Sequence, residues 1–259
     1  MTGRTAAGLV LGLIVAAAAP APAQDASAGD DGFSRFVLEL EAGPAWQTRN
    51  DVQIPNDPSG TRFSLREPTG SGPWPAGRVY LTWRIDEEHS LRGLVAPLSF
   101  TETGSLPKPV DFAGESYSPD APAEATYRFN SYRLGYRYRF HHGRSWTWRV
   151  GFTAKIRDAV VRLEQGGTSS EKTDLGFVPL LHVSGEWRFA RRWHAELDAD
   201  ALAGGPGRAE DVSLKAGYDL GDRWTVSAGY RTVEGGADVD SVYAFAWLHY
   251  GVVSLEYRF

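Results

Sequence analysis

From Arg35 onward, apolar residues recur at every second position along the chain. Residues 146–156 illustrate the pattern, because their even-numbered positions are all apolar and their odd-numbered positions are mostly polar or small. A period of two is that of a β-strand, whose successive side chains point to opposite faces. No segment in this part of the chain has a convincing helical period. The sequence therefore predicts an all-β fold.

The alternation falls into ten separate runs, each of which predicts a strand. They span residues 35–48, 76–85, 89–101, 124–140, 145–163, 174–190, 192–203, 208–220, 222–234 and 241–259. Tight turns at 86–88, 141–144, 190–191 and 221–222 alternate with longer connections, of which 49–75 and 102–123 are rich in Pro and Gly. Short turns on one side, long loops on the other and an even strand number are typical of an outer-membrane barrel. We predict a single antiparallel transmembrane β-barrel of ten strands, or of eight if the first two runs are irregular.

Aromatic residues gather near the predicted tight turns, which would be the periplasmic side of such a barrel. Amphipathic rings favour the interface between membrane and water, so a girdle of aromatic side chains is expected there. The predicted periplasmic girdle consists of Trp83, Phe140, Trp146, Trp148, Trp187, Phe189, Trp193, Trp224, Tyr257 and Phe259.

The chain ends at Phe259, with Tyr257, Leu255 and Val253 on the same predicted face. In this the sequence resembles the bacterial outer-membrane β-barrels as a class, whose last strand ends in an aromatic residue preceded by alternate apolar ones. The resemblance implies the outer membrane of a Gram-negative bacterium, contact with its lipid and lipopolysaccharide, and recognition of Phe259 by the barrel assembly machinery.

The N-terminus has the pattern of a secretory signal. Arg4 precedes an apolar stretch from Thr5 to Ala19, and small residues at 21–23 predict cleavage after Ala23. The alternative is a membrane anchor, but the stretch of about 15 residues is short for a span that needs about 20. We expect a signal peptide at 1–23, a short polar leader at 24–34 and the barrel at 35–259.

The charged residues fix which face of each strand points inward. An arginine at the bilayer midplane on the lipid face costs about 2–4 kcal/mol, so the apolar face must meet lipid and the charges must line the lumen. The predicted luminal charge network is Glu39, Glu41, Arg84, Arg133, Arg137, Arg149, Lys155, Arg157, Glu186, Glu196, Asp198, Asp200, Lys215 and Arg231. Other predicted inward charges are Arg78, Arg92, Arg139, Arg188, Asp211, Asp219, Glu256 and Arg258.

The signs of these inward charges are segregated: strands two to five are basic, and strands seven, eight and one are mostly acidic. A ten-stranded lumen is only slightly wider than the eight-stranded one that side chains fill, so long arginines would cross it and pair with carboxylates. We expect a largely plugged, charge-paired lumen. The alternative is a narrow polar conduit for ions or small solutes.

The sharpest catalytic candidate is His182 with Asp198 and Asp200. A tight turn at 190–191 would pair position 182 with about 199, so all three side chains would point inward from adjacent strands, where a His–Asp pair can act as a general base. Ten-stranded barrels include the omptin proteases, which use Asp–His and Asp–Asp pairs near the extracellular rim. Here His182 would lie near mid-bilayer, out of reach of a protein substrate, so we favour a place in the luminal network.

Other chemistry is weakly indicated or excluded. Glu234, Asp238 and Asp240 lie in a predicted external loop, where three carboxylates could hold a divalent cation or form a solvated acidic turn. The absence of cysteine excludes disulfides, zinc–thiolate sites and cysteine nucleophiles. An excess of acid, 32 Asp and Glu against 27 Lys and Arg, argues against binding nucleic acid. No cofactor is expected.

The favoured function is therefore a non-enzymatic outer-membrane protein, either structural or recognising an external ligand that the sequence does not identify. Loops 49–75 and 102–123 are the expected recognition surface. Their aromatic residues Trp74, Phe112 and Tyr117 could anchor a partner or fold back over the barrel mouth. A narrow, porin-like channel is one alternative, and a hydrolase centred on His182, Asp198 and Asp200 is another.

Overall fold

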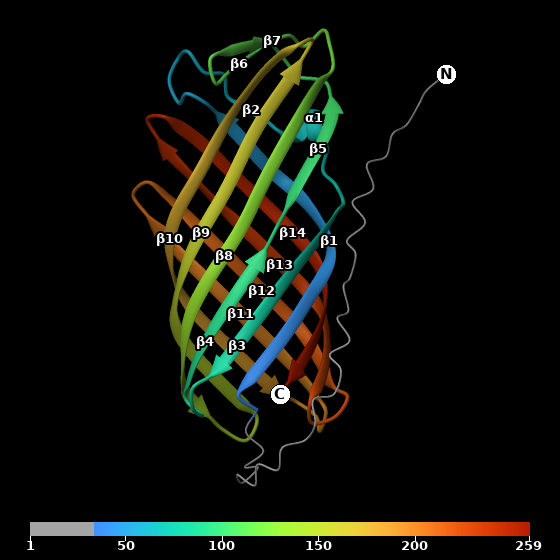
Figure 1. Cartoon of the computed structure of the whole chain (residues 1–259), viewed down its shortest axis with the longest axis vertical. Helices are drawn as coiled ribbons and strands as arrows, with labels where there is room; N and C mark the ends of the chain where they lie inside the picture. The colour runs from blue at the N-terminus through green and yellow to red at the C-terminus, as the bar shows by residue number, and fades with distance from the viewer. Residues whose placement is uncertain (1–33) are drawn as a thin grey trace, which may run out of the picture. The chain divides into compact units, whose positions relative to one another are not determined.

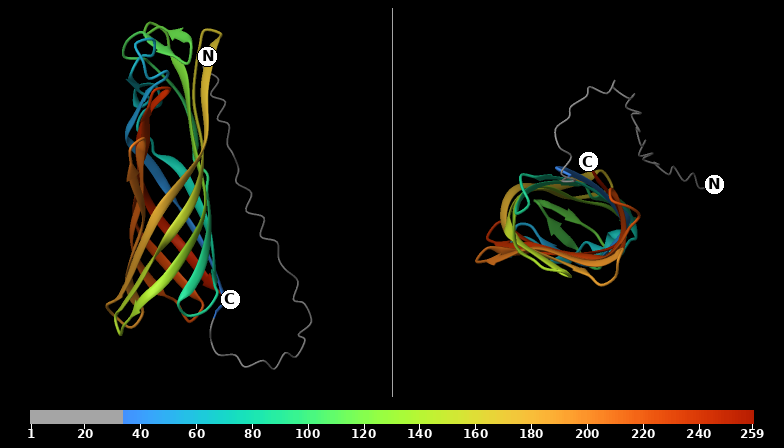
Figure 2. Two further views of the ribbon diagram at one scale, coloured as in Figure 1. Left: turned by 90° about the vertical axis from the view of Figure 1, so that its left-hand side faces the viewer. Right: turned by 90° about the horizontal axis from the view of Figure 1, so that it is seen from below.

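The computed structural model describes residues 34–259, which form a closed antiparallel β-barrel (Figures 1 and 2). The predicted signal peptide and leader residues 24–33 lie outside the described residues. The wall consists of β1 (Phe36–Gln53), β3 (Trp74–Arg84), β4 (His89–Ala96), β8 (Ala123–His142), β9 (Trp146–Gln165), β10 (Thr168–Arg188), β11 (Trp193–Gly204), β12 (Gly207–Asp219), β13 (Trp224–Val239) and β14 (Val242–Arg258).

Neighbouring wall strands pair in chain order, and β14 pairs with β1 to close the ring. A further strand, β5 (Ser99–Gly104), continues the path of β4 after an interruption at residues 97–98, because both pair with β8. The barrel thus has ten strands, which confirms the ten-stranded prediction over the eight-stranded alternative. No helix in the described part of the chain has the length and hydropathy needed to cross a membrane.

The first strand runs five residues beyond its predicted end at position 48. Its register shifts between Gln47 and Arg49, which marks a β-bulge. Before the bulge the buried residues are at odd-numbered positions, Ala45 and Gln47. After it they are at even-numbered positions, Asn50 and Val52. The extra residue changes the phase of the alternation, so a search for an unbroken period of two ends at the bulge although the strand continues.

The connections at the periplasmic end are tight turns, as expected. In the first of them, the Asp86 carboxylate accepts hydrogen bonds from the backbone N–H groups of His89 and Glu88, both at 2.8 Å. These bonds favour the ionised form and lower the pKa of the Asp86 carboxyl below its ordinary value.

At the outer end, three connections differ from the longer loops that we expected. The strands continue to pair up to two-residue turns at 166–167, 205–206 and 240–241. Gly166 and Gly167 have φ angles of 59° and 93°, as the two central residues of a type I′ hairpin turn require. The extra length is strand rather than loop because polar residues continue the pairing where apolar alternation has ended.

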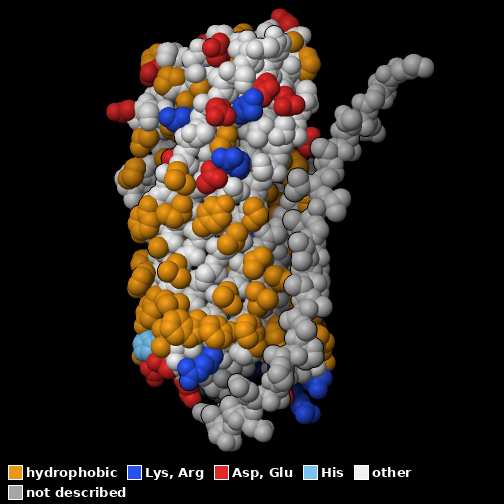
Figure 3. Space-filling model, viewed as in Figure 1, with side chains coloured by type: hydrophobic (Ala, Val, Ile, Leu, Met, Phe, Trp, Pro, Cys, Tyr) orange, Lys and Arg blue, Asp and Glu red, His pale blue; other side chains and the backbone are white. Residues whose placement is uncertain are grey.

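The outer surface carries an apolar belt that ends in a row of aromatic side chains (Figure 3). Charged side chains lie below this row and again towards the outer end. Five tryptophans of the predicted girdle are 43–46 % exposed: Trp83, Trp146, Trp187, Trp193 and Trp224. Phe140, Phe189 and Phe259 are also exposed, and Trp148 and Tyr257 are partly exposed. Such a surface is the kind that a barrel presents to lipid.

The two long connections fold back into the outer end of the barrel. They contain β2 (Phe63–Ser64), α1 (Arg66–Thr69), β6 (Val110–Phe112) and β7 (Glu115–Tyr117). Phe112, Tyr117 and Trp74 are at most 7 % exposed, and the Trp74 ring stacks on Phe100 with centroids 3.6 Å apart. These aromatics therefore belong to an apolar core rather than to an exposed binding surface. We call this structure, residues 54–73 and 105–122, the cap.

Candidate functional site

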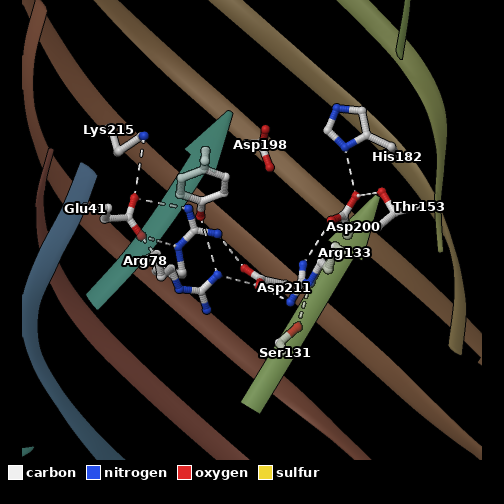
Figure 4. Close-up of polar contacts among 12 residues, drawn as sticks. Glu41, Arg78, Ser131, Arg133, Thr153, His182, Asp198, Asp200, Asp211 and Lys215 are labelled. Carbon is white, nitrogen blue, oxygen red and sulfur yellow. Dashed lines mark hydrogen bonds and ion pairs between the residues drawn. The ribbon is translucent and has the colours of Figure 1, made fainter. Parts of the chain in front are cut away.

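The middle of the barrel interior is a network of buried ion pairs (Figure 4). At its centre, the Asp211 carboxylate on β12 accepts hydrogen bonds from three guanidinium groups. The distances are 3.0 Å to Arg78, 2.6 Å to Arg133 and 2.6 Å to Arg231. Asp211 is 2 % exposed, so its charge is compensated by these groups rather than by water.

Two glutamates on β1 extend the network. The Glu41 carboxylate accepts hydrogen bonds from both Nε and Nη2 of Arg231, at 3.0 and 3.2 Å. This two-bond geometry suits a guanidinium and a carboxylate. Glu39 lies 2.6 Å from Arg92 and 2.5 Å from Lys215. The Arg92 guanidinium also lies over the Tyr80 ring, 4.0 Å from its centroid.

The candidate histidine site belongs to the same network. His182 on β10 lies opposite Asp200 on β11, and its Nδ1 is 2.9 Å from an Asp200 oxygen. The other Asp200 oxygen accepts a hydrogen bond from Arg133 at 2.9 Å. Asp198 instead lies 3.2 Å from both Arg92 and Arg137. The His182 side chain has no exposed surface, and its Nε2 has no partner in the described structure.

The ion pairs join opposite sides of the wall. Arg92 on β4 reaches Asp198 on β11, and Arg133 on β8 reaches Asp200 and Asp211 on β11 and β12. The long arginine side chains cross the lumen because the basic and acidic strands face each other around the ring. Two cavities within this layer measure about 20 Å³ and 10 Å³.

Other predicted network residues lie nearer the periplasmic end, where Glu196 is still 3.7 Å from Lys215. A polar vestibule of about 110 Å³ at the periplasmic end is lined by residues that include Arg84, Arg149, Glu186 and Glu196. Within residues 34–259, neither Arg84 nor Arg149 has a carboxylate within 4.0 Å. Further pairs near this end are Arg139–Glu87, Arg188–Glu186, Arg188–Asp219 and Arg258–Glu256.

Two residues of the predicted luminal charge network, Arg157 and Lys155, make none of the ion pairs of the central network. Arg157 pairs with Asp174 on the neighbouring strand, towards the outer end. Lys155 is 3 % exposed and has no carboxylate within 4.0 Å in the described residues. Its ammonium nitrogen lies 4.8 Å from the centroid of the Phe129 ring instead.

Sequence reasoning missed Tyr80 and the apolar upper interior. Tyr80 shares the inward face of Arg78, two residues away, so strand parity alone could have identified it. In β8, the inward positions change from Arg133 to Tyr127 and then Ala125, which marks the height at which the cap replaces the charges.

The acidic cluster does not form the predicted loop. Glu234 and Asp238 lie on β13, where Glu234 pairs with Arg208 and Asp238 accepts a hydrogen bond from Asn56 at 2.8 Å. Asp240 lies in the following turn. Regular pairing with β12 and β14 extends through residues that the apolar pattern left as loop. No group of three or more potential metal ligands occurs in the described chain.

No known family model and no curated protein matches this chain. Among solved structures, the outer membrane protease OmpT from Escherichia coli is similar at 10 % identity over 86 % of this chain and 96 % of that chain, with a TM-score of 0.47. The translocator domain of the Neisseria meningitidis autotransporter NalP is similar at 12 % identity over 89 % and 90 %, with a TM-score of 0.43.

A third structure is Ail, the attachment invasion locus protein of Yersinia pestis, in complex with the heparin analogue sucrose octasulfate. It shares 10 % identity over 87 % of this chain and 99 % of that chain, with a TM-score of 0.41. Likenesses at this level carry no argument about function. The closed ring, the apolar belt and the aromatic girdle identify the architecture by themselves. The chain folds as an outer-membrane β-barrel.

Proposed function

We propose that the protein is a closed, non-enzymatic outer-membrane barrel that acts through its outer end rather than as a pore. The observation that carries the proposal is the layer of buried ion pairs that crosses the lumen at mid-height. The Asp211 carboxylate by itself accepts hydrogen bonds from guanidinium groups on three strands, β3, β8 and β13. An ion entering this layer would have to displace arginines that already neutralise their carboxylates.

The free space in the lumen supports the same proposal. The cavities of about 20 Å³ and 10 Å³ in the charged layer are comparable with the about 10–15 Å³ that a single water molecule needs. Above this layer, the apolar cap adds a second barrier, built around fully buried Phe112 and Leu65. An ion would meet a layer of paired charges and an apolar core in series.

Burial of His182 supports the non-enzymatic part of the proposal. A general base must come within hydrogen-bond reach of the proton that it removes, and the His182 side chain has no surface that a substrate could contact. Wild-type protein and His182→Ala are therefore expected to have the same turnover of lipid and peptide substrates, namely none above background. Turnover lost in a folded His182→Ala variant would establish the hydrolase alternative.

The outer surface of the cap is the proposed recognition surface. Asp111, Glu115 and Ser116 on the β6–β7 hairpin are exposed, whereas the apolar residues of the same hairpin point into the core. A folded cap presents polar groups in fixed positions, as functional loops on rigid scaffolds do. We further propose that lipid and lipopolysaccharide surround the belt and that Phe259 is the signal read by the assembly machinery.

The test is planar-bilayer conductance of the refolded barrel, with its heat-modifiable gel shift as the folding control. Wild-type protein is expected to show no discrete openings. Replacing residues 105–122 by a short Gly-Ser turn should remain silent, because the charged layer is intact. Adding Arg133→Ala and Asp211→Ala to that deletion should produce openings. Steady openings of folded wild-type protein would instead establish the channel alternative.

A further inference from the structure

The barrel wall is incomplete on one side of its outer half. Strand β10 pairs with β9 from Thr168 to Trp187, but it pairs with β11 only from Leu181 to Arg188. The β10 edge from 168 to 180 therefore has no neighbouring strand on that side in the described chain. Pro179, which has no backbone N–H, lies close to the point where pairing stops. In Figure 1, the β11–β12 turn lies lower than the tips of β9–β10 and β13–β14.

A pocket of about 100 Å³ lies at this gap. Its lining includes Val178 on the free edge of β10, Ala209 near the tip of the β11–β12 hairpin, and the outer ends of β13 and β14. The lining is largely apolar and includes Val52, Val160, Val161, Ala244 and Phe245. The pocket has several times the about 10–15 Å³ that one water molecule needs, unlike the cavities of the charged layer.

Beside the pocket, the outward face of β10 is apolar. Leu175 and Phe177 on the outer face of β10 are 76 % and 65 % exposed, and Thr173 and Glu171 beyond them are polar. The apolar belt therefore ends at about this height, which places the opening at the outer leaflet of the membrane. A molecule dissolved in that leaflet could enter without crossing water.

An unpaired cation lies in the wall of this pocket. Six Lys and Arg side chains are buried in the described structure, and Lys155 alone among them makes no ion pair; the others are Arg78, Arg92, Arg133, Lys215 and Arg231. Burying an ammonium group without a compensating charge is costly, so an anion bound beside Lys155 would stabilise its charged form. The pocket lining contains four cations and two carboxylates, Asp174 and Glu234, which leaves an excess of two positive charges.

We propose that this pocket is a lateral binding site for a single-chain fatty carboxylate taken from the outer leaflet. The carboxylate binds the Lys155 ammonium, and the alkyl chain lies along the apolar wall and leaves the barrel through the gap beside Val178. The Lys155 ammonium presents one point charge, which a monoanionic carboxylate balances. The small volume favours one chain over a multi-chain lipid.

The test is equilibrium binding of dansyl-labelled undecanoic acid to the refolded full chain in phosphatidylcholine nanodiscs, with palmitate and the neutral hexadecanol as competitors. Wild-type protein should show saturable fluorescence, displaced by palmitate at a concentration roughly tenfold or more below that of hexadecanol, because an ion pair to the lysine adds at least that much. Lys155→Met should lose this preference while hexadecanol still competes. Lys108→Met, an exposed cap lysine, is the matched control and should behave as wild type.

A second variant on another strand keeps the test independent of one substitution. Val178→Trp should fill the opening and weaken displacement by both competitors. No saturable signal above protein-free nanodiscs in folded wild-type protein would overturn the proposal, as would an unchanged palmitate preference in folded Lys155→Met. Displacement by lipid A at lower concentrations than palmitate would identify a membrane lipid as the occupant and would also overturn it.

Discussion

Asp211 shows how single residues set the character of the lumen. Its two oxygens accept hydrogen bonds from three arginines that come from three strands, and it is separated from Arg78 by 133 positions in the sequence. Each arginine in turn reaches a second group: Arg231 bonds Glu41, Arg133 bonds Asp200, and Arg78 lies close to Glu41. The carboxylate therefore links both halves of the wall, and its loss leaves several buried positive charges together.

We predict that Asp211→Asn destabilises the folded barrel by about 3–5 kcal/mol, the usual effect of breaking a buried ion pair by removing one partner. The measurement is urea unfolding of the protein in lipid vesicles, followed by the heat-modifiable gel shift. The control is Asp222→Asn in the exposed β12–β13 turn, which has no ion pair within 4.0 Å in the described chain and should change stability by less than about 0.5 kcal/mol. Equal stability of the two variants would contradict a network held by Asp211.

At the scale of elements, the strands and the cap differ in how they are held. Each wall strand is fixed by two neighbours, whereas the β6–β7 hairpin forms a separate two-stranded sheet. Apolar packing anchors this hairpin: Phe112 has no exposed surface and meets Phe63 edge-on, with centroids 6.1 Å apart. Tyr117 adds a hydrogen bond from its hydroxyl to the Leu163 carbonyl oxygen at 3.0 Å.

Phe112→Ala should therefore loosen the cap while leaving the wall intact. Truncating a buried phenylalanine costs about 3–5 kcal/mol, and here the cost falls on a hairpin that pairs with no wall strand. We expect faster proteinase K cleavage within residues 105–122, with the gel shift unchanged. Phe140→Ala, which removes an exposed girdle ring of the same size, should leave cap cleavage at the wild-type rate. A cap that resists cleavage equally in both variants would show that Phe112 does not anchor it.

The bulge in β1 shows the limit of pattern reading at this scale. The position of each strand and its lipid-facing side follow from alternation, so ten strands could be predicted with small errors at their ends. Alternation fails where one extra residue changes its phase, as at Thr48, and where pairing continues through polar residues, as in β13. Both cases depend on hydrogen bonds to a neighbouring strand, which the local pattern does not contain.

At the scale of the whole molecule, the seam between β1 and β14 closes the ring. Phe36 and Phe259 exchange backbone hydrogen bonds of 3.0 and 2.9 Å, and their rings stack with centroids 5.7 Å apart. The last residue thus has a structural role at the seam besides its proposed role as an assembly signal.

These two roles of Phe259 can be separated. In Phe259→Ala protein refolded in vesicles, loss of the ring contact should cost only about 0.5–1.5 kcal/mol, because the backbone bonds remain. In cells, the amount of folded barrel in the outer membrane should fall severalfold if the assembly machinery reads this ring. A cellular level that follows the small stability loss alone would contradict the signal role, and Phe140→Ala provides the comparison.

The sequence by itself determined the all-β class, the strand number, the face that meets lipid and the inward direction of the charges. These follow from alternation and from the cost of placing a charge in hydrocarbon, and both act on each strand separately. Only the tertiary structure decided which arginine meets which carboxylate, that the cap fills the outer lumen, and that β10 lacks a neighbour beside Lys155. These features depend on the registers that the strands adopt around the closed ring, where residues far apart in sequence become neighbours.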